Sequence, residues 1–149
     1  MAGPYFEDYR TGEVVRAPGV TVTEAEIVHF ALQYDPQPIH LDRHAAAGSL
    51  YGGLIASGFQ ILALGFRMLL QAGFIGTGSA GSPGLDEVRW LRPVRPGDTI
   101  RAEAEVIETR PSSSKPDRGV VRVAYRIVNQ DGEVVTTFRA AQLILRRPT

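Results

Sequence analysis

The spacing of apolar residues changes along the chain from a helical period to an alternating one. In the first half, Thr23 precedes an apolar helical pattern and Glu26 stands three residues later, which together make the capping box that begins many helices. The residue before a proline is disfavoured in the α region, so Pro36 ends this helix. The pattern therefore predicts a helix that ends near Tyr34.

Residues 35–40 carry two prolines separated by one residue. Proline fixes its own φ and lacks a backbone N–H, so we expect a stiff, extended, non-helical loop here. A short turn of helix is predicted over residues 42–47. Three glycines within residues 48–53 then form a flexible approach to the next element.

The longest apolar run, Ile55–Phe74, is predicted to be one long central helix. Its length of about 20 residues would also suit a membrane span. However, Gln60, Arg67 and Gln71 fall on one narrow stripe, while Leu, Ile, Phe and Met cover most of the remaining surface. This distribution favours a helix buried inside a domain, with the polar stripe as its wetter edge.

The second half of the chain alternates apolar and polar residues. This period of two predicts half-buried antiparallel strands, joined mostly by short turns such as the hairpin turn at residues 129–132. A long apolar helix can bury most of its circumference only if a curved sheet wraps around it, so the predicted fold class is α+β. The predicted strands cover residues 88–90, 100–106, 121–127 and 134–145.

Composition and charge narrow the range of functions. With 149 residues and 44% hydrophobic content, residues 1–149 are expected to form a single domain. Sixteen basic and sixteen acidic residues give no net charge, so we expect a small ligand rather than nucleic acid or a membrane. The absence of cysteine excludes disulfides, thiolate metal sites and a cysteine nucleophile. The N-terminal residues lack the pattern of a secretory signal, so a cytoplasmic location is expected.

Asp35 and His40 are the candidate acid/base pair. The prolines between them can hold both side chains toward one point at little entropic cost. A neighbouring carboxylate and imidazole can activate a water and return a proton near neutral pH. The alternative on local grounds is that Asp35 only ends a helix and that His40 belongs to a local hydrogen-bond network.

Gly58 is the candidate for a backbone oxyanion site. The unpaired N–H groups and the dipole at the start of the long helix favour negative charge, and a residue without a side chain lets a carbonyl oxygen come close. The alternative is a glycine required for packing of the helix against the sheet. The neighbouring Ser57 is interpreted as a hydrogen-bonding residue at the helix start, because no Gly-x-Ser-x-Gly pattern marks it as a nucleophile.

The three histidines do not predict a metal site. His29 lies in a helical pattern among apolar neighbours. His40 and His44 are four residues apart, but they are predicted to lie on different elements. Neither a helical pair of histidines with a glutamate base nor a set of cysteines accompanies them, so no metal is expected.

Two motifs carry a resemblance to a known family. Residues 34–42, Tyr-Asp-Pro-Gln-Pro-Ile-His-Leu-Asp, are followed at residues 51–59 by Tyr-Gly-Gly-Leu-Ile-Ala-Ser-Gly-Phe. Together they resemble the hydratase motif of the MaoC-like family, which includes the (R)-specific enoyl-CoA hydratases. Residues 21–31 and 88–98 resemble the flanking elements of the family, so the resemblance covers nearly the whole chain.

The resemblance implies a hot-dog fold, in which an antiparallel sheet wraps a central helix, and a homodimer or higher homo-oligomer in which two sheets join. It implies addition of water to a trans-2-enoyl-CoA, or the reverse dehydration of a 3-hydroxyacyl-CoA, with no metal or organic cofactor. By position, Asp35 and His40 match the family's catalytic pair. Gly58 matches the residue whose backbone N–H polarises the thioester carbonyl.

Two positions depart from the family pattern and bear on the substrate rather than on the reaction class. Gln37 stands where the motif usually has Asn, and so carries its amide one methylene further from the backbone. Ser57 stands where the triplet before the helix often has His. The predicted substrate-binding residues are Gln37, Tyr51, Ser57 and Phe59.

Two other functions remain open from the sequence. A hot-dog thioesterase would use a carboxylate and water to attack the thioester carbonyl, and a non-catalytic subunit would bind acyl-CoA without turnover. The presence of both Asp35 and His40 argues against the second. The acyl pocket is expected between residues 41–51, Phe59 and Leu62.

Overall fold

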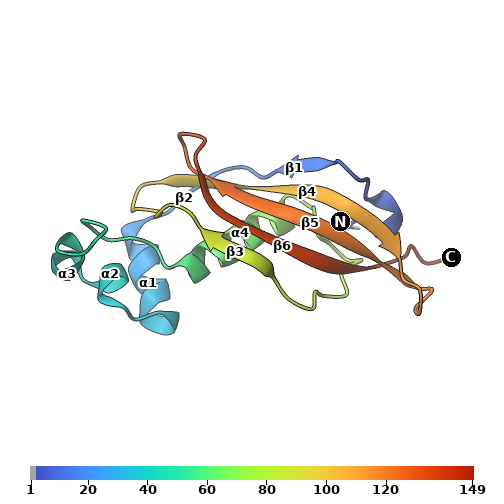
Figure 1. Ribbon diagram of the computed structural model, residues 1–149, viewed down its shortest axis with the longest axis horizontal. Coiled ribbons are helices and arrows are strands. Elements are labelled where there is room, and N and C mark those ends of the chain that lie inside the picture. The colour runs from blue at the N-terminus through green and yellow to red at the C-terminus, as the bar shows by residue number, and fades with distance from the viewer. Residues whose placement is uncertain (1–2) are drawn as a thin grey trace.

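The computed structural model describes residues 3–149, in which a curved antiparallel sheet wraps around one helix (Figure 1). Its strands are β1 (Val14–Arg16), β2 (Val20–Thr21), β3 (Asp86–Trp90), β4 (Thr99–Pro111), β5 (Arg118–Val128) and β6 (Val134–Leu145). Within the described range, five of these strands follow the order β1-β4-β5-β6-β3, and β2 pairs with β4 beside this path. The predicted α+β hot-dog arrangement is confirmed.

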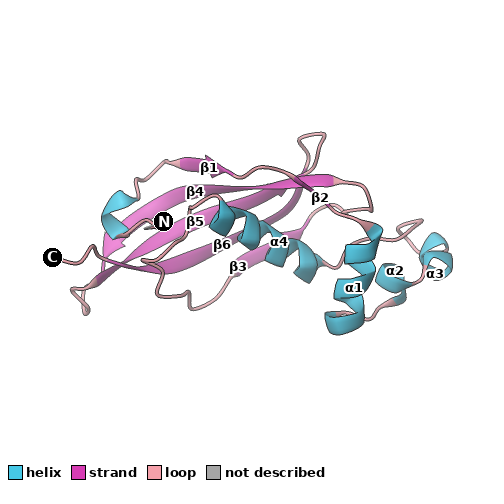
Figure 2. Ribbon diagram, turned by 180° about the vertical axis from the view of Figure 1, so that it is seen from behind, coloured by secondary structure: helices cyan, strands magenta, loops and turns pink. Residues whose placement is uncertain are grey.

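The helices lie in two groups. Helix α4 (Gly58–Gln71) runs along the inner face of the sheet, as Figure 2 shows from behind. The short helices α1 (Glu24–Tyr34), α2 (Pro38–Leu41) and α3 (Arg43–Ala47) gather beyond one end of the sheet (Figures 1 and 2). A single 3-10 turn, η1 (Phe6–Asp8), lies near the other end. Across residues 3–149, none of the helices has the length and apolar character needed to cross a membrane.

The predicted start and end of α1 are confirmed. Thr23 Oγ1 accepts a hydrogen bond from Glu26 N at 3.2 Å, and Glu26 Oε2 accepts one from Thr23 N at 3.1 Å. The helix ends at Tyr34, and Asp35 leaves the helical conformation with φ −152° and ψ 68°. The first candidate side chain therefore stands at the C-terminal end of α1.

The prediction that residues 35–40 are non-helical is wrong in its second half. Gln37 is extended, but Pro38 begins the four-residue helix α2, which contains His40. A proline at the first helical position loses nothing by lacking an N–H, because that N–H has no partner within the helix, and its fixed φ suits the helix. The two prolines thus have different roles: Pro36 follows the end of α1 and Pro38 begins α2.

The central helix is shorter than the predicted range Ile55–Phe74. It begins at Gly58, because Ile55 N donates to Ile39 O at 3.1 Å and Ala56 N donates to Val94 O at 2.8 Å, which keeps the preceding segment extended. It ends at Gln71, after which Gly73 takes a positive φ of 77° and turns the chain away. Hydrophobicity alone did not separate the helix from its extended flanks.

The prediction of a wetter polar edge on α4 is confirmed for Arg67 and Gln71, which are exposed, and is wrong for Gln60. Gln60, a member of the predicted polar stripe, is only 5% exposed. Beside Arg67 and Gln71, the exposed side also carries Phe59 at 61%, Phe66 at 37% and Leu70 at 43% exposure. An apolar stripe of the central helix therefore faces away from the sheet.

The core lies between α4 and the sheet. Gly65 brings the helix close to the strands, because a Cβ there would approach Ile127 Cδ1 to 2.5 Å. On the sheet, Tyr125 stacks on Phe138 with ring centroids 4.5 Å apart and an interplanar angle of 12°. Both rings belong to the same buried cluster as the alternating apolar residues of β4 and β5.

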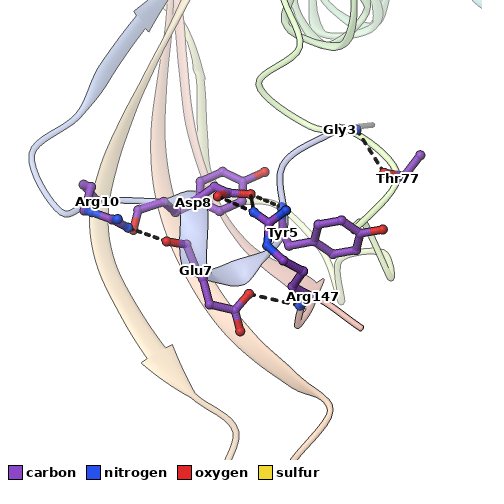
Figure 3. Close-up of polar contacts among 8 residues, drawn as sticks. Gly3, Tyr5, Glu7, Asp8, Arg10, Thr77 and Arg147 are labelled. Atoms are coloured by element: carbon purple, nitrogen blue, oxygen red, sulfur yellow. Dashed lines mark hydrogen bonds and ion pairs between the residues drawn. The ribbon is translucent and has the colours of Figure 1, made fainter. Parts of the chain in front are cut away.

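The two termini are joined at the end of the molecule opposite α1–α3 (Figures 2 and 3). Arg147 forms an ion pair with Asp8, with Nη2 2.7 Å from Oδ1, and its backbone N donates to Glu7 Oε2 at 3.0 Å. Gly3 N donates to Thr77 Oγ1 at 3.0 Å. These contacts anchor the N-terminal segment and lie away from the candidate residues.

A buried carboxylate joins three strands. Glu103 of β4 lies 2.5 Å from Arg126 Nη2 of β5, 3.3 Å from Arg16 Nε of β1 and 3.6 Å from Arg101 Nη2. Burial raises the pKa of Glu103, but the hydrogen bonds and charges of the three arginines outweigh burial and hold it below its ordinary value. The cluster stabilises the sheet rather than forming part of the predicted site.

Candidate active site

Asp35 and His40 come together where α1, α2 and the segment before α4 meet. Asp35 Oδ2 lies 3.2 Å from His40 Nε2, and both side chains are largely buried, with 14% and 5% exposure. The spacing of five residues places them in contact because α1 ends at Tyr34 and α2 turns the chain back after Gln37. The two predicted acid/base groups therefore do lie side by side.

The orientation of His40 is fixed by a backbone carbonyl. His40 Nδ1 lies 2.7 Å from Ile55 O, and a carbonyl oxygen can only accept, so Nδ1 carries the proton. Nε2 is left to face the carboxylate of Asp35. The two atoms that could exchange a proton with a water, Nε2 and Oδ2, therefore lie together.

The carboxylate of Asp35 is held by further donors. Gln37 Nε2 donates to Oδ1 at 2.7 Å, and Ser57 Oγ donates to Oδ2 at 2.7 Å. Partial burial raises the pKa of Asp35, but the hydrogen bonds from Gln37 and Ser57 and the nearby His40 outweigh it, so the pKa lies below its ordinary value. Asp35 is therefore ionised at neutral pH.

The start of α4 lies beside this pair. Ser57 caps the helix, since its Oγ accepts from Phe59 N at 3.3 Å while donating to Asp35. Gly58 is the first helical residue, so its N–H has no acceptor within the helix. The helix start thus presents a free backbone donor next to the carboxylate and imidazole.

A cleft of about 520 Å³ contains these groups. Asp35, Gln37, His40 and Gly58 line it, together with the predicted substrate contacts Tyr51 and Phe59. Apolar side chains make much of the rest of the wall. These include Ile39, Ile55, Ile61 and Val94. Its shape and lining suit a small, partly apolar ligand.

Other predicted residues have different places. Ser57 is fully buried and reaches the site through Asp35 rather than by lining the cleft, and Leu62 does not line it. His40 and His44 stand on separate helices, as predicted. Among residues 3–149, no group of three or more His, Asp or Glu side chains has the arrangement of a metal site.

The sequence model of the MaoC-like domain matches residues 7–128. The chain belongs to the MaoC-like family. Of its motif residues, Asp35, Gln37, Ile39, His40 and Gly58 line the cleft, and Ser57 reaches it through Asp35.

Solved MaoC-like structures share the whole fold. A MaoC-like dehydratase from Rhodospirillum rubrum is 40% identical, covers 99% of this chain and 100% of its own, and superposes with a TM-score of 0.92. An (R)-hydratase from Pseudomonas aeruginosa in its unliganded form is 27% identical over 97% of this chain and 88% of its own, with a TM-score of 0.80.

A longer relative carries a named reaction. Mesaconyl-CoA hydratase from Cereibacter sphaeroides is 34% identical over 99% of this chain, which spans 43% of that relative's length. The family and these relatives support hydro-lyase chemistry in general.

Sequence reasoning missed the far wall of the cleft. Trp90, Arg92 and Thr136 line it, and Arg92 Nη1 pairs with Glu133 Oε2 at 3.0 Å. Trp90 ends β3, Arg92 lies in the loop that follows, and Thr136 belongs to β6. Strands β3 and β6 are paired, with Trp90 opposite Thr136. Only the pairing of distant strands brings them to the site, so no local pattern identified them.

Proposed function

We propose that this MaoC-like protein adds water to the double bond of a trans-2-enoyl-CoA and, in reverse, dehydrates a 3-hydroxyacyl-CoA. The observation that carries the proposal is the contact of 3.2 Å between Asp35 Oδ2 and His40 Nε2 beside the free N–H of Gly58. A thioester carbonyl at Gly58 N–H would place its double bond within reach of the pair.

In the proposed reaction, Asp35 and His40 together hold one water. As its oxygen bonds to C3, the pair takes one of its protons, and the electrons of the double bond pass toward the thioester oxygen. The Gly58 N–H stabilises the negative charge on that oxygen. The pair then delivers a proton to C2 and so returns to its original protonation state, which requires neither a metal nor an organic cofactor.

The walls of the cleft support an acyl substrate. Ile39, Ile55 and Ile61 offer apolar surface to a hydrocarbon chain, while the polar groups cluster where the thioester would lie. Gln37 is engaged with Asp35 rather than free to bind substrate. We therefore assign Gln37 and Ser57 to holding the carboxylate, and Tyr51 and Phe59 to the entrance.

We also propose a homodimer in which two sheets join. Strand β3 is an edge of the sheet and pairs only with β6 within the described chain. Next to it, Phe59, Phe66 and Leu70 form the exposed apolar stripe of α4. An unpaired strand edge beside an apolar helix face is typical of a surface that is covered by association.

The reaction is tested by loss of enone absorbance with a panel of enoyl-CoA chain lengths. We expect Asp35→Asn and His40→Ala each to lower kcat/KM by at least about 10²-fold, as loss of an acid/base group does, with the fold retained by circular dichroism. Near-normal turnover in either variant would contradict the assignment.

Matched controls and a second assay separate the alternatives. Asp131→Asn, at an exposed hairpin position, and His44→Ala, at an exposed position of α3, make the same chemical changes outside the cleft and should leave turnover unchanged. Release of free CoA from the thioester would instead identify a thioesterase. Binding of acyl-CoA without turnover of any chain length would identify a non-catalytic subunit.

A further inference from the structure

Trp90 is an aromatic residue of the cleft that has no role in the reaction proposed above. It is the single tryptophan of the chain and lies at the end of edge strand β3. Its side chain is 50% exposed, so its position is not explained by burial in the core. It lines the same cleft as Asp35 and His40.

The indole of Trp90 lies directly beside Gly58. A Cβ placed on Gly58 would overlap Nε1 and Cε2 of the indole, so the missing side chain is what admits the ring. In an α-helix the Cα–Cβ bond tilts toward the N-terminus, the direction in which the first-turn N–H groups also point. Trp90 Nε1 therefore lies against the first residue of the helix, close to where the Gly58 N–H is free.

A second aromatic contact holds the ring. Phe59 meets Trp90 edge to face, with ring centroids 5.6 Å apart and an interplanar angle of 66°. The indole Nε1–H can only donate, and it takes part in none of the side-chain hydrogen bonds formed within residues 3–149. The cleft wall thus includes an indole held by Gly58 and Phe59 whose N–H has no side-chain acceptor among these bonds.

We propose that Trp90 Nε1–H is a second donor to the thioester oxygen, beside the Gly58 N–H. This inference rests on the proposed hydratase function. Oxyanion sites work by aiming fixed donors at the atom on which negative charge develops, and two donors stabilise that charge more than one. Gly58 then has two roles: it supplies the backbone donor and makes room for the second.

The test removes the N–H and keeps the ring. Because Trp90 is the single tryptophan, expression in a tryptophan-requiring strain with β-(3-benzothienyl)alanine replaces NH by S at this position alone. We expect this protein and Trp90→Phe both to lose kcat by about 10²-fold, the usual cost of removing one oxyanion donor. Tyr5→Phe, which changes a ring substituent at the far end of the molecule, should not alter kcat.

The isosteric replacement decides between a donor and a packing residue. If the benzothienyl protein turns over within about twofold of the native protein, the N–H does not act on the substrate and the proposal fails, even if Trp90→Phe is impaired.

A binding measurement separates this inference from the proposed function. Butyryl-CoA, which has no double bond to hydrate, and its S-butyl thioether analogue, which has no carbonyl, are titrated calorimetrically into the native and benzothienyl proteins. We expect the native protein to prefer the thioester by about three- to tenfold, the value of one or two neutral hydrogen bonds, and the benzothienyl protein to lose part of this preference. An unchanged preference overturns the role of Trp90 whether or not the native protein hydrates enoyl-CoA. Absence of hydration by the native protein instead overturns the proposed function.

Discussion

Removing the Ser57 hydroxyl tests how the carboxylate of Asp35 is tuned. Ser57 Oγ donates to Asp35 Oδ2 at 2.7 Å from a fully buried position, and Asp35 is only 14% exposed, so water replaces this bond poorly. A hydrogen bond to a charged group is worth about 1.5–3 kcal/mol, and 1.4 kcal/mol is about tenfold in an equilibrium. In Ser57→Ala the ionised form of Asp35 should therefore be disfavoured about tenfold or more.

The expected result is a change in the pH profile. The pKa of Asp35 lies below its ordinary value partly because of this hydroxyl, so its loss should displace the acid limb of kcat/KM for hydration to higher pH. At a pH on that limb, activity should fall about tenfold, while activity on the plateau changes less. The assay is enoyl-CoA hydration across a pH series with constant ionic strength.

The control separates this effect from loss of a helix cap. Ser57 also caps α4, and loss of a serine or threonine cap costs about 1 kcal/mol of stability. Thr23→Ala removes the equivalent cap from α1, where Thr23 Oγ1 accepts from Glu26 N. It should lower the free energy of unfolding similarly without moving the pH profile. An acid limb in Ser57→Ala that coincides with the native one would refute the reasoning.

Two further predictions concern assembly and stability. Phe66→Glu, which places a charge in the exposed apolar stripe, should convert the proposed dimer to a monomer in light scattering. Leu32→Glu, which makes the same kind of change at an exposed apolar position of α1, should not. A native protein that is already monomeric would contradict the proposed dimer. Glu103→Gln should lower the free energy of unfolding at pH 7, because it removes the charge that pairs with the arginines. The loss should be only about 1–2 kcal/mol, because the arginine partners are half exposed and solvent screens the interaction. Since the pKa of Glu103 is lowered by folding, this stabilisation is present above the pKa of the unfolded state and disappears as the pH falls through the folded value. The difference from the native protein in urea unfolding should therefore shrink on acidification; a constant difference would show that the charge of Glu103 does not matter.

Local rules predicted the elements whose causes are local. The capping box at Thr23 and Glu26 and the stop before Pro36 gave α1 with its observed ends. The same kind of reasoning failed for α2, because proline favours the first position of a helix as much as it disfavours the interior. His40 does contact Asp35, but the turn of helix α2 brings them together rather than an extended loop.

The pattern along α4 predicted a helix and the exposure of Arg67 and Gln71, but it did not predict the exposed apolar residues or the burial of Gln60. An apolar side chain fits a core and an association surface equally well, so Phe66 and Leu70 gave no signal of their exposure. Conversely, Gln60 is buried although its type is usually exposed. The face that meets the sheet carries Gly65, and the polar residues alone do not separate this face from the exposed apolar stripe.

The difference between the two walls of the cleft follows from how each is assembled. Asp35, His40 and Gly58 lie within one stretch of chain, so the spacing of the two motifs is enough to group them. Trp90 reaches Gly58 only because β3 pairs with β6 in the register that sets Trp90 opposite Thr136. A shift of one residue would turn Trp90 to the other face of the sheet, and alternation along a five-residue edge strand does not exclude that shift. The near wall is therefore predictable from sequence, whereas the residue proposed to complete the oxyanion site depends on a strand register that the sequence does not fix.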